Sequence, residues 1–263
     1  MPYTISHTAA VLPFSRWLAP RRLLSAAVIG SMIPDAGYLL PWDPPRSETH
    51  SLVALFAFCL PMGLLAYWIF QLLIKRAVLE ALPDGSYWRA HPYAAAARLG
   101  NARQWLVAAA GVLAGAVTHV AWDGFTHEGA RGVRMFPALN DDLANVGGHQ
   151  LLIFKLLQQG SSLFGLAVVI WIAGRALCAR APNPRPQRTL RAAERAAWFS
   201  VYPATAALAS LAALALGPHH RHGAVAILGE TAIALLRGLA FAAIVVSAAL
   251  RLRLRLWSAR RHR

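Results

Sequence analysis

The chain has 263 residues, of which 57% are hydrophobic and 14% are charged, and its formal net charge is +15. Soluble domains carry about 25% charged residues, so this composition excludes an ordinary soluble protein. The positive charge alone would suggest a nucleic-acid partner, but the basic residues are distributed as in a membrane protein, so we expect the lipid bilayer and not nucleic acid as the partner.

In chain order, the first expected element is a short helix at 7–18, which turns back at Ala19-Pro20 and brings His7 to the depth of Asp35. A weak apolar run follows at 23–40, interrupted by Pro34 and Asp35. Five stronger runs each approach or exceed the ~20 residues that span a bilayer. They are Leu52–Ile74, Trp105–Trp122, Leu151–Leu177, Ala196–Leu216 and Ala224–Leu250. We predict an all-α transmembrane bundle of about six spans plus a short N-terminal helix, without strands.

The basic residues also predict the orientation and the division of the chain. Twenty of the 26 lysines and arginines fall in the N-terminal segment, in alternate loops and in the C-terminal tail, and four fall in the intervening loops. Basic loops stay in the cytoplasm, so we expect a cytoplasmic C-terminus. We expect a motif-bearing membrane domain at 1–178, a Pro/Arg-rich cytoplasmic linker at 179–195 and a two-span hairpin with a basic tail at 196–263.

The most informative motif is T-H-V-A-W-D-G-F-T-H, which places His119, Asp123 and His127 at four-residue spacing at the end of an apolar run. Residues at this spacing share one face of a helix. Ionisable groups are costly inside a membrane and usually functional there. Because imidazole and carboxylate are also metal ligands, the motif favours a metal site.

Other ionisable residues fall at the same predicted ends of the spans, so we expect them to share that site. The candidate metal ligands are His7, Asp35, His50, His119, Asp123 and His127. Zinc is the expected divalent ion, and manganese or iron would also suit these ligands. Six candidates exceed what one ion requires, so two ions, or one ion with supporting residues, both stay open.

Neighbouring residues suggest further roles. Glu48 and Glu128 each lie beside a candidate ligand, which makes them candidate catalytic bases. His149, Lys155 and Gln158 lie at the start of the fourth span. We expect them to bind the substrate, with His149 and Lys155 facing an anionic group.

Plainer interpretations exist for several of these residues. Asp123 could pair with Arg131 or Arg134, Asp35 could end a helix, and Lys155 could extend to the membrane surface. The polar residues would then order a membrane scaffold or form the pathway of a transporter. We keep this non-enzymatic alternative beside a metal-dependent hydrolase.

Several motifs resemble those of a family of bacterial integral membrane proteins of unknown function. They are M-P-Y-T-I-S-H-T-A-A-V-L-P at the start, I-G-S-M-I-P-D at 29–35, T-H-S at 49–51, H-V-A-W-D-G-F-T-H at 119–127 and F-K-L-L-Q-Q-G-S-S-L-F-G at 154–165. More distantly, the order His, Pro-Asp, Thr-His-Ser, His-x3-Asp is similar to that of bacterial inner-membrane metal-dependent hydrolases, which are in turn similar to zinc-dependent phospholipases C.

The resemblance implies a multi-pass protein of the bacterial inner membrane and favours hydrolysis of an ester or phosphoester. The expected position of the site at the membrane–water boundary suggests a lipid-linked substrate. The resemblance also implies metal ligation by His7, Asp35, His50, His119 and Asp123. His127 departs from the distant pattern and is the weakest candidate ligand.

Overall fold

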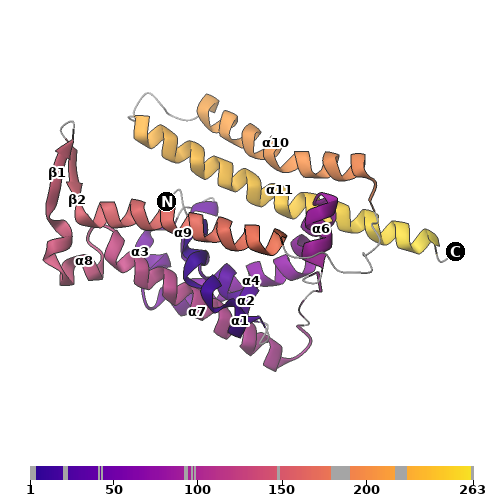
Figure 1. Ribbon diagram of the computed structural model, residues 1–263, viewed down its shortest axis with the longest axis horizontal. Helices are drawn as coiled ribbons and strands as arrows, with labels where there is room; N and C mark the ends of the chain where they lie inside the picture. The colour runs from indigo at the N-terminus through magenta and orange to yellow at the C-terminus, as the bar shows by residue number, and fades with distance from the viewer. Residues whose placement is uncertain are drawn as a thin grey trace. The chain divides into compact units, whose positions relative to one another are not determined.

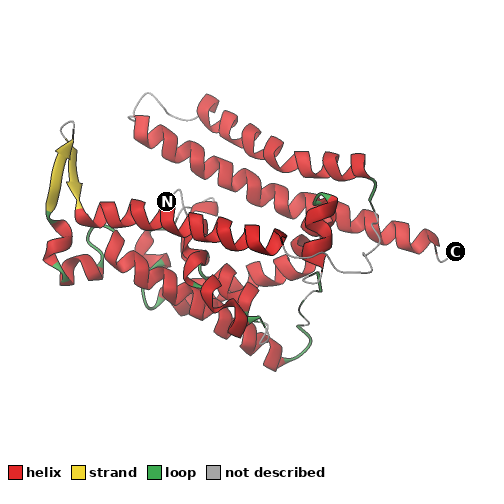
Figure 2. Ribbon diagram, viewed as in Figure 1, coloured by secondary structure: helices red, strands yellow, loops and turns green. Residues whose placement is uncertain are grey.

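The computed structural model describes residues 4–19, 23–40, 42, 44–91, 94–95, 97, 99–146, 149–178, 190–216 and 224–261, and these are mostly helical (Figure 2). The chain forms two compact units. The site unit comprises Tyr3–Tyr67 and Leu99–Ala173, and the hairpin unit comprises Trp68–Arg98 and Gly174–Arg263 together with Met1–Pro2.

Five helical segments among the described residues are long and apolar enough to cross a membrane. They are Leu55–Ala81, Ala102–Thr126, Ile153–Ala176, Ala192–Ala215 and Glu230–Arg253. Each overlaps one of the five strong apolar runs in the sequence. The prediction of an all-α, multi-pass membrane bundle is therefore confirmed.

The weak run at 23–40 does not form a long helix. It is divided into the α-helix α2 (Leu24–Gly30) and the 3-10 helix η3 (Ile33–Leu39), so it is not a sixth span. Pro34 at the start of η3 lacks the backbone N–H that a continuous helix would need. The break places the buried carboxylate of Asp35 in the first turn of η3.

The site unit contains two long helices, α7 (Ala102–Thr126) and most of α9 (Ile153–Cys178), together with a series of shorter segments (Figure 1). Before α7 the chain forms η1 (Thr4–Ala10), η2 (Leu12–Phe14), α1 (Ser15–Leu18), α2, η3, α3 (Arg46–Thr49), the π-helical η4 (Leu55–Cys59) and α4 (Leu60–Ile69). After it come α8 (Arg131–Met135), η7 (Pro137–Asn140), β1 (Asp142–Val146), β2 (His149–Leu152) and α9.

Small residues let α2 approach α7 closely. A Cβ atom on Gly115 would lie 2.0 Å from the carbonyl oxygen of Ala27, and one on Gly30 would lie 2.1 Å from that of Val112. Such contacts between small residues are typical of helix pairs in membranes. The close packing fixes α7 against the segment that leads into Asp35.

The strands β1 and β2 correct the expectation of a chain without strands. They pair antiparallel, with Asn145 opposite Gln150. The connecting residues 147–148, which the sequence marks as a Gly-Gly turn, lie outside the described residues. A glycine pair between two short segments is a known hairpin signal. Because the strands are short and exposed, they lack the apolar alternation that would have revealed them.

The hairpin unit is built from long regular helices. The helices α10 (Ala192–Leu216) and α11 (Ala224–Arg261) run antiparallel side by side (Figure 1). The same unit includes η5 (Phe70–Ile74) and α5 (Lys75–Ala81), which pack against α11, and α6 (Asp84–Ala90), which contacts α5. Buried Ala77, Leu190 and Leu250 form a small core. Most of the expected linker at 179–195 lies outside the described residues, so the three-part division stays a prediction.

Candidate metal centre

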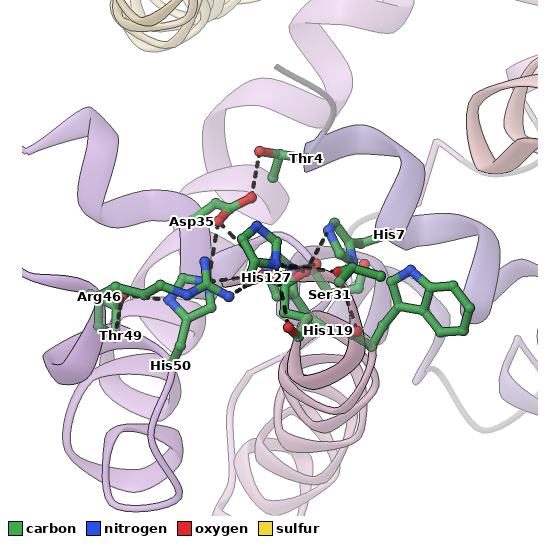
Figure 3. Close-up of polar contacts among 12 residues, drawn as sticks. Thr4, His7, Ser31, Asp35, Arg46, Thr49, His50, His119 and His127 are labelled. Carbon is green, nitrogen blue, oxygen red and sulfur yellow. Dashed lines mark hydrogen bonds and ion pairs between the residues drawn. The ribbon is translucent and has the colours of Figure 1, made fainter. Parts of the chain in front are cut away.

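Four of the six candidate ligands converge in the site unit (Figure 3). Asp35 lies on η3, His50 directly follows α3, and His119 and Asp123 lie one turn apart on α7. Each offers one ligand atom, and these atoms lie within 4.8 Å of one another. All four side chains are at most 7% exposed. This buried cluster could bind a metal ion.

The distances within the cluster are too long for ordinary hydrogen bonds. His50 Nε2 lies 3.3 Å from Asp35 Oδ1 and 3.4 Å from Asp123 Oδ2. His119 Nε2 lies 3.6 Å from Asp35 Oδ1 and 3.3 Å from Asp123 Oδ2. N–H···O bonds usually measure about 2.7–3.2 Å.

Four buried atoms of the cluster therefore have no hydrogen-bond partner among the described residues. They are Asp35 Oδ1, His50 Nε2, His119 Nε2 and Asp123 Oδ1. Buried polar atoms in folded proteins are nearly always paired. The first three face one another, with Asp123 Oδ2 beside them, whereas Asp123 Oδ1 faces His7. This arrangement of nitrogen and oxygen lone pairs fits a bound cation.

Hydrogen bonds on the outer side of the imidazoles orient their inner nitrogens. His119 Nδ1 lies 2.7 Å from the carbonyl oxygen of Ser31, to which it can only donate. His50 Nδ1 lies 2.7 Å from Thr49 Oγ1, whose hydroxyl oxygen can accept the Nδ1 proton. With Nδ1 protonated in each ring, Nε2 keeps its lone pair toward the cluster. Metal-binding histidines commonly have such outer partners.

Sequence reasoning missed these supporting residues. Thr4 belongs with them, since its hydroxyl donates to Asp35 Oδ2 at 2.7 Å. The available signal was weak, because a short polar residue near a candidate ligand is common in any sequence. Thr49 directly precedes His50, and Ser31 precedes Asp35 by four residues.

His7 lies against the four converging residues. Its ring stacks on His119 with centroids 3.7 Å apart, and its Nε2 lies 3.5 Å from Asp123 Oδ1. Burial, followed by the nearby His119, lowers the pKa of His7 to about 4, so the ring is neutral near pH 7. Burial alone would raise the pKa of Asp35, but the adjacent His119 and His50 hold that pKa below its usual range. Neutral imidazole and ionised carboxylate are the forms that bind metals.

His127 contacts Asp123 and does not belong to the converging group of four. The side-chain amide of Gln158 lies 2.8 Å from His127 Nε2, and an amide nitrogen can only donate. The proton of His127 is therefore on Nδ1, which lies 3.3 Å from the carbonyl oxygen of Asp123 and 3.6 Å from its Oδ1. Burial lowers the pKa of His127, which favours this neutral form.

Arg46 is the cationic partner of Asp123. Its Nη2 donates to Asp123 Oδ2 at 2.6 Å. The expected pairing of Asp123 with Arg131 or Arg134 is wrong, because Asp123 points into the bundle whereas both arginines lie exposed on α8. Arg46 was missed as a site residue, although it precedes His50 by four residues.

The other predicted residues lie at the edge of the site. Glu48 and Glu128 are exposed. Glu128, Lys155 and Gln158 line an open cavity of about 540 Å³ together with His127. His149 belongs to β2, but its side chain is not among those described.

Fold and cluster together define a multi-pass helical membrane protein with a buried His/Asp cluster that could bind a metal ion. The chain belongs to the family described as Domain of unknown function (DUF4184), whose model matches residues 1–248 and so includes the whole cluster. No curated protein and no solved structure matches the chain significantly.

Proposed function

We propose that the chain is a membrane-embedded, metal-dependent hydrolase that acts on an ester or phosphoester, with a lipid-linked molecule as its substrate. The observation that carries this proposal is a set of three buried ligand atoms, Asp35 Oδ1, His50 Nε2 and His119 Nε2, which converge beside Asp123 without hydrogen-bond partners among the described residues. Leaving buried polar atoms unpaired costs about 1–3 kcal/mol each, and a cation would relieve these three together.

Zinc is the ion that these donors favour. Zinc binds nitrogen and oxygen at about 2.0–2.2 Å, so neighbouring ligands of a tetrahedral zinc lie about 3.4 Å apart. The separations between imidazole nitrogen and carboxylate oxygen are 3.3–3.6 Å, which supports this choice. Two carboxylates would also neutralise a divalent ion, which lowers the cost of burying it.

The position of Asp123 makes His7 a candidate for a further metal ligand. Its Oδ2 faces His50 and His119, whereas its Oδ1 lies 3.5 Å from His7 Nε2. A carboxylate can contact two ions, so His7 could provide a further ligand to one ion or a ligand to a second. The two arrangements differ in stoichiometry and are separated by metal analysis.

A divalent ion bound here would lower the pKa of a water molecule from about 15.7 toward about 7 and polarise an ester. The protein's own side chains orient the ligands and provide a base that accepts a proton. Ser31 and Thr49 hold the imidazoles of His119 and His50, and Thr4 holds the carboxylate of Asp35. Of the two proposed bases, Glu128 is the better placed, because it lines the cavity beside His127.

The same cavity supports a lipid-linked substrate. Its lining is mostly apolar, with Leu151, Phe154 and Leu156 beside the ammonium-bearing Lys155. Apolar walls suit acyl chains, and one cation suits a phosphate. We further propose residence in the bacterial inner membrane with a cytoplasmic C-terminus, which reporter fusions to the chain ends would test.

Metal analysis of the purified full chain tests the proposal. We expect the wild-type protein to retain one or two divalent ions per chain and to hydrolyse a member of a phospholipid and lipid-ester panel. Asp123→Ala should lose both properties. Asp141→Asn changes an exposed acid elsewhere in the site unit and is the control that should keep both.

Two other outcomes would count against the proposal. A folded wild-type protein that takes up no zinc, manganese or iron would leave a structural polar cluster as the interpretation. A protein that binds the ion but translocates a solute without hydrolysis would favour the transporter alternative.

A further inference from the structure

Arg46 occupies a position that conflicts with a bound cation. Its Nη2 lies 2.6 Å from Asp123 Oδ2, an oxygen that also lies within 3.4 Å of both His50 Nε2 and His119 Nε2. An ion bonded to that oxygen at about 2.0–2.2 Å would be within about 5 Å of the guanidinium. Two cations so close in a buried site repel each other strongly. The ion pair of Arg46 with Asp123 would therefore compete with a bound ion for the same carboxylate oxygen.

The surroundings of Arg46 offer its guanidinium a second position, away from Asp123. The side chain is 34% exposed, unlike that of Asp123, which is 1% exposed. Arg46 also lines a cavity of about 180 Å³, together with Pro34, Tyr38 and Pro44. One water molecule takes up about 30 Å³ of liquid, so this space could hold a phosphate group. The arginine thus faces the buried cluster on one side and an accessible cavity on the other.

An anion between the ion and the arginine would remove the repulsion. The guanidinium has five N–H donors in a planar fork that matches phosphate oxygens. A phosphate whose oxygens accept from this fork would offset the positive charge of Arg46 beside the cluster. A neutral ester offers no such charge, so the arrangement selects for an anionic substrate.

We infer that Arg46 is an exchangeable counter-ion, which pairs with Asp123 when the metal is absent and binds the phosphate group of the substrate when the metal is present. This inference rests on the proposed function and narrows it to phosphoesters. The phosphate could belong to a lipid headgroup or to a soluble molecule, since the recognition chemistry is the same.

The test measures binding by the purified full chain, independently of turnover. Arg46→Gln removes the competing cation, so zinc affinity should rise several-fold. The same variant should bind inorganic phosphate at least tenfold more weakly when loaded with metal, as measured by ³¹P NMR titration. Arg46→Lys keeps the charge but loses the fork, so its phosphate affinity should lie between those of wild type and Arg46→Gln.

Arg103→Gln is the matched control. Arg103 is exposed on α7, twenty residues before Asp123 and hence about 30 Å away along the helix. This variant should bind zinc and phosphate as the wild type does. Circular dichroism of each variant establishes that it is folded.

A second arm identifies the source of the phosphate. A soluble short-chain phosphatidic acid that competes more tightly than inorganic phosphate assigns a lipid headgroup, and equal affinity assigns a soluble phosphate. Unchanged or weaker zinc affinity in Arg46→Gln, or unchanged phosphate affinity, would overturn the inference while leaving the hydrolase proposal standing. Absence of metal binding in the wild type would instead remove the hydrolase proposal itself.

Discussion

The two units of the chain use helices in different ways. The hairpin unit packs the long helices α10 and α11 against each other, with Gly238 of α11 close to Ala209 of α10. The site unit also has long helices, but before α7 its backbone is broken into short α, 3-10 and π segments. The first arrangement relies mainly on apolar contact between helices, whereas the second brings side chains from distant parts of the sequence to one point.

The position of the irregular segments explains why they are tolerated. Non-helical backbone at membrane depth survives only where it is buried in protein or lines a cavity. In the site unit, η1 carries His7, η3 carries Asp35, and His50 lies between α3 and η4. The irregular segments therefore carry or adjoin three of the candidate ligands. The regular helix α7 carries His119 and Asp123, against which the other ligands are placed.

The largest effect should come from separating α2 from α7. In Gly115→Ala, the new Cβ would meet the carbonyl oxygen of Ala27 at 2.0 Å, and no side-chain rotation can relieve a backbone clash. We expect a loss of about 3 kcal/mol or more of unfolding free energy, together with the metal site. Thermal denaturation and metal content would measure both.

Gly124→Ala on the same helix is the control for that variant, since a Cβ there has nothing within 4 Å. It should leave both measurements unchanged. If Gly115→Ala also behaves as the wild type, the close contact between α2 and α7 does not support the site.

The next effect concerns pH. The pKa of His7 is about 4 in the folded protein and about 6.5 in an unfolded chain. The unfolded chain therefore binds this proton first as the pH falls. The contribution of His7 to the free energy of unfolding is fully present above pH 6.5 and decreases by about 3 kcal/mol in all as the pH falls toward 4.

Thermal midpoints of the metal-free protein between pH 7 and pH 4 would measure this dependence. His7→Gln should flatten it, whereas His91→Gln in the hairpin unit should not. A wild-type slope in His7→Gln would show that acid destabilisation arises elsewhere.

A smaller effect, on zinc affinity, should follow from removing the side-chain partner that orients the imidazole of His50. Thr49→Val removes the hydroxyl at His50 Nδ1 while preserving the side-chain shape. Losing an outer partner of a ligand typically weakens metal affinity 10- to 100-fold. Zinc titration against a competing chelator would measure the change. Thr118→Val is the control, because the Thr118 hydroxyl bonds within its own helix to the carbonyl oxygen of Gly115.

The contrast between the units also explains what the sequence could predict. Length and apolarity identify a spanning helix without any knowledge of its neighbours, which is why five spans could be located. The four-residue spacing of His119 and Asp123 likewise specifies a shared face by local geometry alone.

Contacts between distant segments could not be predicted in the same way. The pairing of Arg46 with Asp123 joins residues 77 apart in the chain, and the choice of Arg46 over Arg131 depends on the path of the broken helices. The hairpin β1–β2 escaped notice because exposed strands need no apolar alternation. In the sequence, only Pro34 and Asp35 indicated that 23–40 is divided into α2 and η3.

The smallest effect should come from the hairpin unit and would sharpen the contrast between the units. Asp84 Oδ1 pairs with Arg195 Nη2 at 2.8 Å, but the Asp84 side chain is 46% exposed. Such pairs contribute less than about 1 kcal/mol, so Asp84→Asn should shift the thermal midpoint slightly and leave zinc content unchanged. Asp35→Asn makes the same chemical change at a buried carboxylate and should abolish zinc retention. Loss of zinc from both variants would mean that metal binding depends on the hairpin unit as well, because the exposed Asp84 is not among the four converging residues.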